Sequence, residues 1–142
     1  MLSSVSQFID YMDKMGVKYD NHGPVGDEGR EVVEVSFGGE NMSTIKTLFY
    51  FEDDAKSVAI RVFNIVKVPA DKVDVMYPAI NAVNKRFRFA KFVLDTNDNT
   101  IQAEMDAVFR SNDVGEICNE LLIRMLDICD KAYPDLMKAL WA

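Results

Sequence analysis

The chain has 142 residues, 49% hydrophobic and 27% charged, a composition typical of a soluble globular domain long enough to bury a core. Its 16 basic and 23 acidic residues give a net charge of -7, which disfavours broad contact with nucleic acid or with a membrane surface. No segment has the roughly 20 consecutive apolar residues that span a bilayer. We therefore expect one cytoplasmic domain, residues 1–142.

The first elements are a helix and a loop. Apolar residues recur at helical spacing up to Met15, Ser3 or Ser4 is placed to cap the helix, and Gly16 is placed to end it. The following segment "DNHGPVGDEG", residues 20–29, is rich in turn-forming residues and has no apolar periodicity. It predicts an exposed, mobile loop.

Three strands follow in the segments 31–37, 44–52 and 57–65, which are rich in β-branched and aromatic residues. Each segment places apolar side chains on one face, and the gaps between them have the length of hairpin connections. The pattern predicts an antiparallel meander that gives one face to the core.

A helix is predicted over residues 71–85, with Asp71 as its cap. Pro78 falls inside this segment, so either the helix is distorted there, which we favour, or it begins only after the proline. The segments 87–95 and 100–109 then predict a second hairpin. A long apolar stripe predicts a last helix over residues 112–140, which Pro134 either kinks or divides.

Cys118 and Cys129 are eleven residues apart in this last helix, too far along it to be bridged. We expect both to be reduced core residues, which agrees with a cytoplasmic location. The predicted order is α-β-β-β-α-β-β-α in an α+β domain.

The stretch "LDTNDNTIQAEMD", residues 94–106, has oxygen-bearing side chains at the spacing of an EF-hand calcium loop: Asp95, Asn97, Asn99 and Asp106. Thr100 stands where such a loop needs glycine, and both flanks have strand rather than helix periodicity. Aspartate and asparagine also favour tight turns. The stretch predicts a hairpin turn and no calcium site.

No catalytic, cofactor-binding or metal-binding residue is predicted. His22 is the single histidine and falls in the loop, and neither cysteine has a neighbour at metal-ligand spacing. The acidic pairs 27–28 and 53–54 are interpreted as solvated turn charges.

The segment "NKRFRFAKF", residues 84–92, alternates cations with phenylalanines. This pattern is found on surfaces that bind single-stranded nucleic acid, but the acidic chain and the missing glycines of the RNA-recognition signature argue against that use. The simplest interpretation is a strand with packed phenylalanines and solvated cations. Its candidate role is the binding of an acidic protein partner through four residues: Lys85, Arg86, Arg88 and Lys91.

The element order, together with "VKVP" (66–69), "AINAVNKRFRFAKFVLD" (79–95) and "YPDLMKALW" (133–141), resembles the YbjN-like family of proposed bacterial sensory-transduction regulators. The similarity runs from about Val33 to Trp141. It implies the fold of type III secretion chaperones, a twisted antiparallel sheet backed by helices, whose members often dimerise and bind extended segments of partner proteins. It supplies no catalytic residue and no cofactor.

These observations predict a non-enzymatic, chaperone-like module that binds proteins or regulates them in bacterial signalling or the stress response. The alternative is a small enzyme or ligand-binding protein with a cleft of Asp and Glu around Arg86 or Arg88. We also expect a homodimer, because Phe87, Phe89 and Phe92 would lie on both faces of one strand, and a second apolar face needs cover. Nucleic acid and membrane are not expected as partners.

Overall fold

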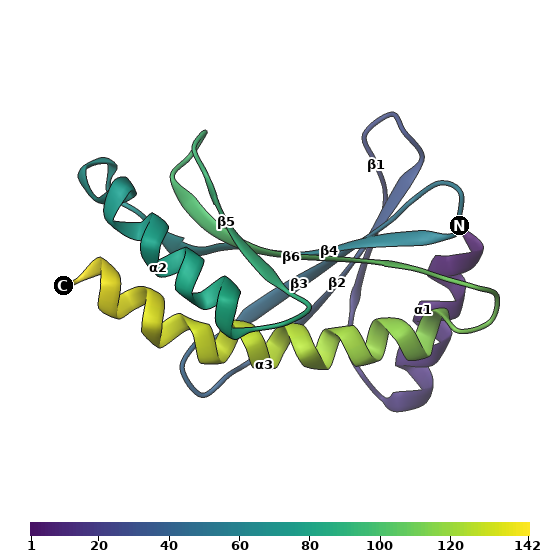
Figure 1. The fold of residues 1–142 in the computed structure, drawn as a ribbon. Helices are drawn as coiled ribbons and strands as arrows, with labels where there is room; N and C mark the ends of the chain where they lie inside the picture. The colour runs from purple at the N-terminus through teal and green to yellow at the C-terminus, as the bar shows by residue number, and fades with distance from the viewer.

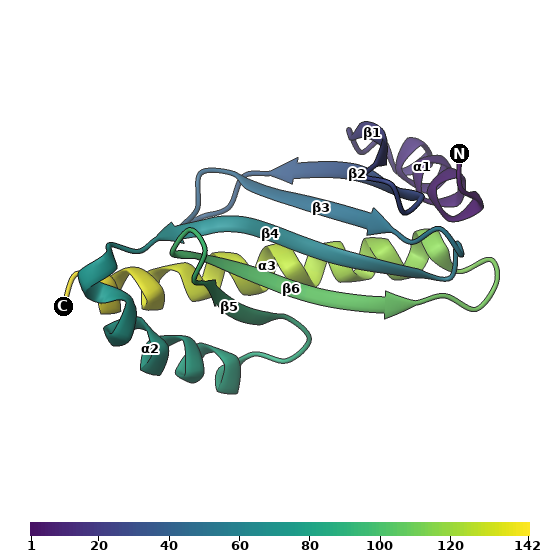
Figure 2. The same ribbon diagram turned by 90° about the horizontal axis from the view of Figure 1, so that it is seen from above.

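All three helices lie on one face of a twisted antiparallel sheet in the computed structural model, which describes residues 1–142 (Figures 1 and 2). The other face of the sheet is open. The helices are α1 (Ser3–Met15), α2 (Val73–Arg86, preceded by a short 3-10 turn, Ala70–Lys72) and α3 (Val114–Leu140). The strands are β1 (Asp20–Val25), β2 (Arg30–Phe37), β3 (Ile45–Phe51), β4 (Ser57–Lys67), β5 (Lys91–Asp95) and β6 (Thr100–Val108).

The sheet has the order β1-β2-β3-β4-β6-β5, and every pair is antiparallel. The predicted meander is β2-β3-β4, and the predicted second hairpin is β5-β6, which joins the meander through β6 rather than through β5. The α+β fold predicted from the sequence is therefore confirmed.

The core lies between the sheet and the helices. Alternate strand residues point into it, as the period of two requires, and the rings of Phe8, Phe49 and Phe51 pack against one another across α1 and β3. The helix α3 runs along the length of the sheet, and its apolar stripe is buried (Figure 2). Cys118 and Cys129 are free and buried in that stripe, as expected.

The segment predicted as a mobile loop instead contains β1, which pairs with β2 and has a register irregularity between Asn21 and Gly23. This prediction was wrong because β1 is an edge strand. Its side chains are largely exposed and so show no apolar alternation, and an edge position tolerates Gly23 and Pro24, which would be unfavourable in a central strand.

Neither predicted helix cap is used. The residue before α1 is Leu2, and no side chain caps α1, whereas Gly16 ends it in the left-handed conformation, as predicted. Asp71 lies in the 3-10 turn rather than at the cap of α2. Both prolines are accommodated within continuous helices, Pro78 in α2 and Pro134 in α3, so α3 is not divided.

Candidate functional site

The predicted basic and aromatic segment is the junction between the end of α2 and the start of β5. Two of its four cations maintain this junction. Lys91 donates hydrogen bonds of 2.8 Å from Nζ to the carbonyl oxygens of Asn84 and Phe87, at the negative end of the α2 dipole. Arg86 binds Asp135 of α3 at 2.6 Å and lies over the Phe87 ring. The remaining cations, Lys85 and Arg88, form no salt bridge.

The three phenylalanines do not share a strand, which corrects the prediction. Pairing of β5 begins only at Lys91, so Phe92 is in the strand and buried, whereas Phe87 and Phe89 precede it. Phe89 has a φ of 76° and is 50% exposed. A positive φ is unfavourable for a bulky side chain, and it turns the chain away from β6. The expected strand with two apolar faces, on which the dimer argument relied, does not exist.

The Phe89 ring has two arginine guanidinium groups over it. The guanidinium of Arg88 is 5.5 Å from the ring centroid, and that of Arg124, from α3, is 4.3 Å from it. We call these three residues the arginine stack. Sequence reasoning missed Arg124 because it is 35 positions from Phe89; its only local signal is the spacing of an exposed ion pair with Glu120.

The register of β6 determines which of its backbone groups face β4. The N–H of Phe109 donates to the carbonyl oxygen of Lys56 at 2.7 Å. Because antiparallel pairs alternate between bonded and non-bonded positions, the N–H and C=O groups of Met105 and Ala107 also point to β4. Those of Asp106 and Val108 point to the opposite side.

That opposite side of β6 is only half occupied. The pairing of β5 with β6 ends at Lys91 and Glu104, so the backbone groups of Asp106 and Val108 meet no strand. Figure 2 shows no other element alongside this half of β6. The Val108 side chain is 76% exposed. We call residues 105–108 the open edge of β6.

The two lateral edges of the sheet are each protected at one point, in contrast to the open edge. On β1, Pro24 lacks an N–H, and the irregularity at Gly23 disturbs the edge. On β5, the Asn84 side chain accepts from the Phe92 N–H at 2.7 Å and donates to the Phe92 C=O at 3.0 Å. The amide of Asn84 thus takes the place that a neighbouring strand would have. Nothing comparable protects the open edge of β6.

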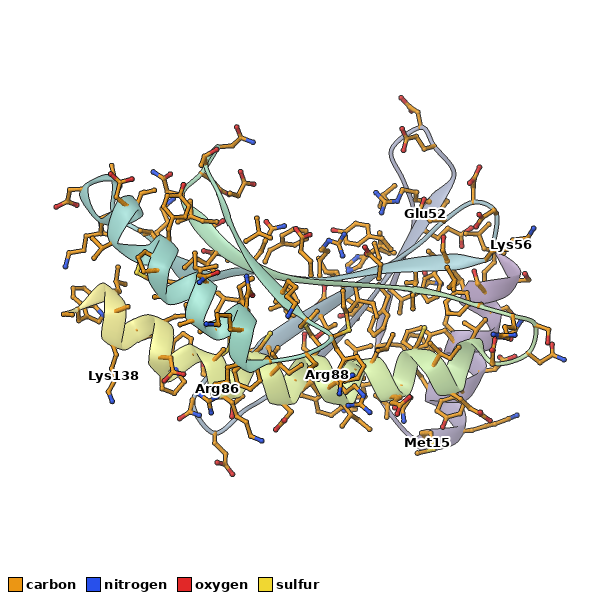
Figure 3. The ribbon with its side chains drawn as sticks, in the orientation of Figure 1. Met15, Glu52, Lys56, Arg86, Arg88 and Lys138 are labelled. Carbon is orange, nitrogen blue, oxygen red and sulfur yellow. The ribbon has the colours of Figure 1, made fainter.

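A shallow groove of about 540 Å³ lies near the open edge, lined by Arg30, Glu52, Arg61 and Asp106 among others. Each carboxylate in it is paired, Glu52 with Arg30 at 3.1 Å and Asp106 with Arg61 at 2.8 Å. Figure 3 shows Arg86 and Arg88 on the helix side of the molecule, far from Glu52. The alternative prediction of an acidic cleft around Arg86 or Arg88 is therefore not supported by their positions.

The calcium-like stretch forms the turn between β5 and β6, as predicted. Asp95 accepts a hydrogen bond from the backbone N–H of Asn97. Asp98 accepts from the hydroxyl of Thr100 at 2.7 Å and from its N–H, and the hydroxyl bond lowers the pKa of Asp98. Asp106 lies well along β6 and binds Arg61. Of the side chains that suggested calcium, Asp95 thus serves the turn and Asp106 a salt bridge.

His22 is an exposed residue of β1, not of a loop, and its Nε2 lies 2.9 Å from Glu34 on β2. The acidic pairs 27–28 and 53–54 lie in turns, as predicted. None of the helices combines the length and the apolar composition needed to cross a membrane.

Comparisons with known proteins were made by sequence and by structure. No family model matches the chain, and no curated protein matches its sequence. Among solved structures, it is similar to YbjN of E. coli, a proposed transcription regulator, with a TM-score of 0.55 and 10% sequence identity. The superposition covers 93% of each chain. Likeness at this identity is a likeness of fold, and the chain therefore has the YbjN-like fold.

Proposed function

We propose that the protein is a non-enzymatic module that binds an extended segment of another protein as an added strand on the open edge of β6. The observation that carries this proposal is the pair of residues Asp106 and Val108, whose backbone N–H and C=O groups point away from β4 beyond the end of β5. Unpaired edges are templates for strand addition. A regulatory role, as proposed for YbjN, and a cytoplasmic location are compatible with such binding.

The protection of the other edges supports this assignment. Proteins generally avoid exposed, unprotected strand edges because these edges promote aggregation. Here Asn84 satisfies the outward backbone groups of Phe92 on β5, and Pro24 removes an N–H from the edge of β1. The open edge has neither lysine nor proline and presents an exposed valine. An edge left open in a chain that protects its other edges is best explained by an occupant.

The test is a selection of dodecapeptides from a random display library against the whole protein. The selected peptides are then measured against two variants of the open edge. Val108→Pro removes an N–H that no strand uses, so it leaves the β4–β6 ladder intact; Val108→Lys adds an edge lysine without changing the backbone. Unfolding by urea shows whether each variant is folded. Val75→Lys, an exposed valine on α2, is the matched control.

We expect the selected peptides to bind the wild type and Val75→Lys equally and to lose at least about tenfold in affinity for both Val108 variants. Amide hydrogen exchange should show protection of Asp106 and Val108 when peptide is bound, because these N–H groups become donors to the added strand. The proposal is overturned by an empty selection, or by peptides that bind both folded Val108 variants as tightly as the wild type.

A further inference from the structure

We propose that the segment bound at the open edge is acidic, and that Arg88 and Arg124 of the arginine stack bind its carboxylates. This inference rests on the proposed function and specifies the chemistry of the partner. It names an extended protein segment with Asp or Glu among apolar residues.

The register places the arginine stack at the start of the open edge. Lys91 is paired with Glu104, so two further residues of β5 would place Phe89 opposite Asp106. At that point the chain leaves the ladder, because Phe89 has a positive φ. An added strand that pairs with Asp106 and Val108 would lie alongside β6 in the position that β5 no longer occupies. One of its ends would meet Phe89.

The stack holds its two guanidinium groups in place before any partner arrives. Each lies against the Phe89 ring at 4.3 or 5.5 Å from the centroid, a favourable cation–π arrangement. Stacking leaves the N–H donors at the edges of a guanidinium able to bind a carboxylate in bidentate fashion. Ordering these side chains in advance reduces the entropy lost on binding. The strained backbone of Phe89 is also typical of functional sites.

The charges around the open edge favour an acidic segment. Arg88 has no salt bridge, and Arg124 has only the surface pair with Glu120 at 3.3 Å, an interaction worth little. At the far end of β6, Arg110 is exposed and unpaired. The one carboxylate on the open edge, Asp106, is neutralised by Arg61. The edge thus has cations at both ends, in a chain with a net charge of -7.

An apolar component follows from the exposed side chain of the open edge. Val108 is 76% exposed, and it points to the face of the sheet opposite the core residues Ala103 and Met105 of β6. Alternate residues of an added strand point to opposite faces of the sheet, so such a strand can offer carboxylates to the arginines on the helix face and an aliphatic group to Val108 on the other face.

The experiment measures the selected dodecapeptides against the double variant Arg88→Gln/Arg124→Gln. Its control is Lys14→Gln/Lys131→Gln, which removes two exposed cations from α1 and from the solvent face of α3. Both variants change the net charge equally. A second arm uses peptides in which every Asp and Glu is replaced by Asn or Gln, measured at low and high salt.

We expect the selected sequences to be rich in Asp and Glu, and we expect the arginine variant to bind them at least about tenfold more weakly than the control does. The peptides with Asn and Gln in place of Asp and Glu should bind the wild type at least about tenfold more weakly than the original peptides do. Their remaining affinity should depend little on the salt concentration. Peptides that are neutral or basic, or that bind the arginine and control variants equally, overturn this inference. If such peptides still fail to bind the Val108 variants, the proposed function stands and only the acidic character of the partner is overturned. If they bind the Val108 variants as tightly as the wild type, both proposals fail.

Discussion

At the scale of single residues, Asp130 of α3 fixes the connection between β2 and β3. Its carboxylate accepts hydrogen bonds of 2.9 to 3.0 Å from three consecutive backbone N–H groups, those of Glu40, Asn41 and Met42. These bonds lower the pKa of Asp130. A side chain on Gly39 would overlap the carboxylate, which explains the glycine there.

We predict that Asp130→Asn lowers the free energy of unfolding by about 1 to 2 kcal/mol at pH 7, because charge-assisted bonds to the loop are lost and the site is partly solvated. The folded-state pKa of Asp130 is below its ordinary value of 3.8, so its stabilisation is present above that pH and is lost as the pH falls through the lowered value. Urea unfolding from pH 7 to pH 2.5 measures the difference between the variant and the wild type.

That difference should shrink below about pH 4, because protonated Asp130 resembles asparagine. Asp127→Asn, which breaks only an exposed pair with Lys131, is the control and should change stability by less than about 0.5 kcal/mol. A difference for Asp130→Asn that stayed constant to pH 2.5 would contradict the assignment. The sequence offered no signal for this contact, since Asp130 and Met42 are far apart in the chain and the donors are backbone groups.

At the scale of elements, those with a strong apolar periodicity were predicted correctly, whereas the two edge strands were not. The three helices and the strands β2, β3, β4 and β6 follow from apolar patterns that a buried face imposes. The strand β1 has exposed side chains and was missed, and β5 was predicted four residues too long because Phe87 and Phe89 look like strand residues. Phe87 packs against Arg86 at the end of α2, and Phe89 contacts Arg124 of α3; the second of these contacts lies outside the local sequence.

For α3, we predict that Leu122→Ala destabilises the protein by about 2 to 5 kcal/mol, because Leu122 is 2% exposed and its truncation leaves a cavity between the helix and the sheet. Urea unfolding measures the change. The neighbouring Ile123 is 59% exposed, and Ile123→Ala should cost less than about 0.5 kcal/mol. A loss that small for Leu122→Ala would mean that the helix presents a different face to the core.

At the scale of the whole molecule, the candidate site arises from three segments that the fold brings together: the end of β6, the connection 87–90 and the middle of α3 (Figure 1). The sequence identified Arg88 as a candidate partner-binding residue. It could not separate Arg88 from Arg86 and Lys91, which maintain the α2–β5 junction. The open edge exists because β5 ends before β6 does. Apolar patterns in the sequence do not show where the pairing of two strands ends.

The last prediction concerns self-association, which stays a proposal: the resemblance of the sequence to the YbjN-like family implies a fold whose members often dimerise. The two-faced strand no longer supports it, but exposed apolar side chains on and beside the helices offer other contacts, among them Val75, Tyr77 and Trp141. We expect light scattering over a hundredfold concentration range to approach twice the 16.1 kDa of one chain. A mass of one chain throughout would contradict the dimer.

The variant Val108→Lys separates this association from partner binding. If the open edge is reserved for a partner segment, the dimer must use another surface, and Val108→Lys should have the same mass as the wild type at every concentration. Two copies that paired through β6 would instead dissociate in this variant, because each would place a lysine in the shared ladder. That result would assign the open edge to a second copy of the chain and would overturn its assignment to an acidic partner.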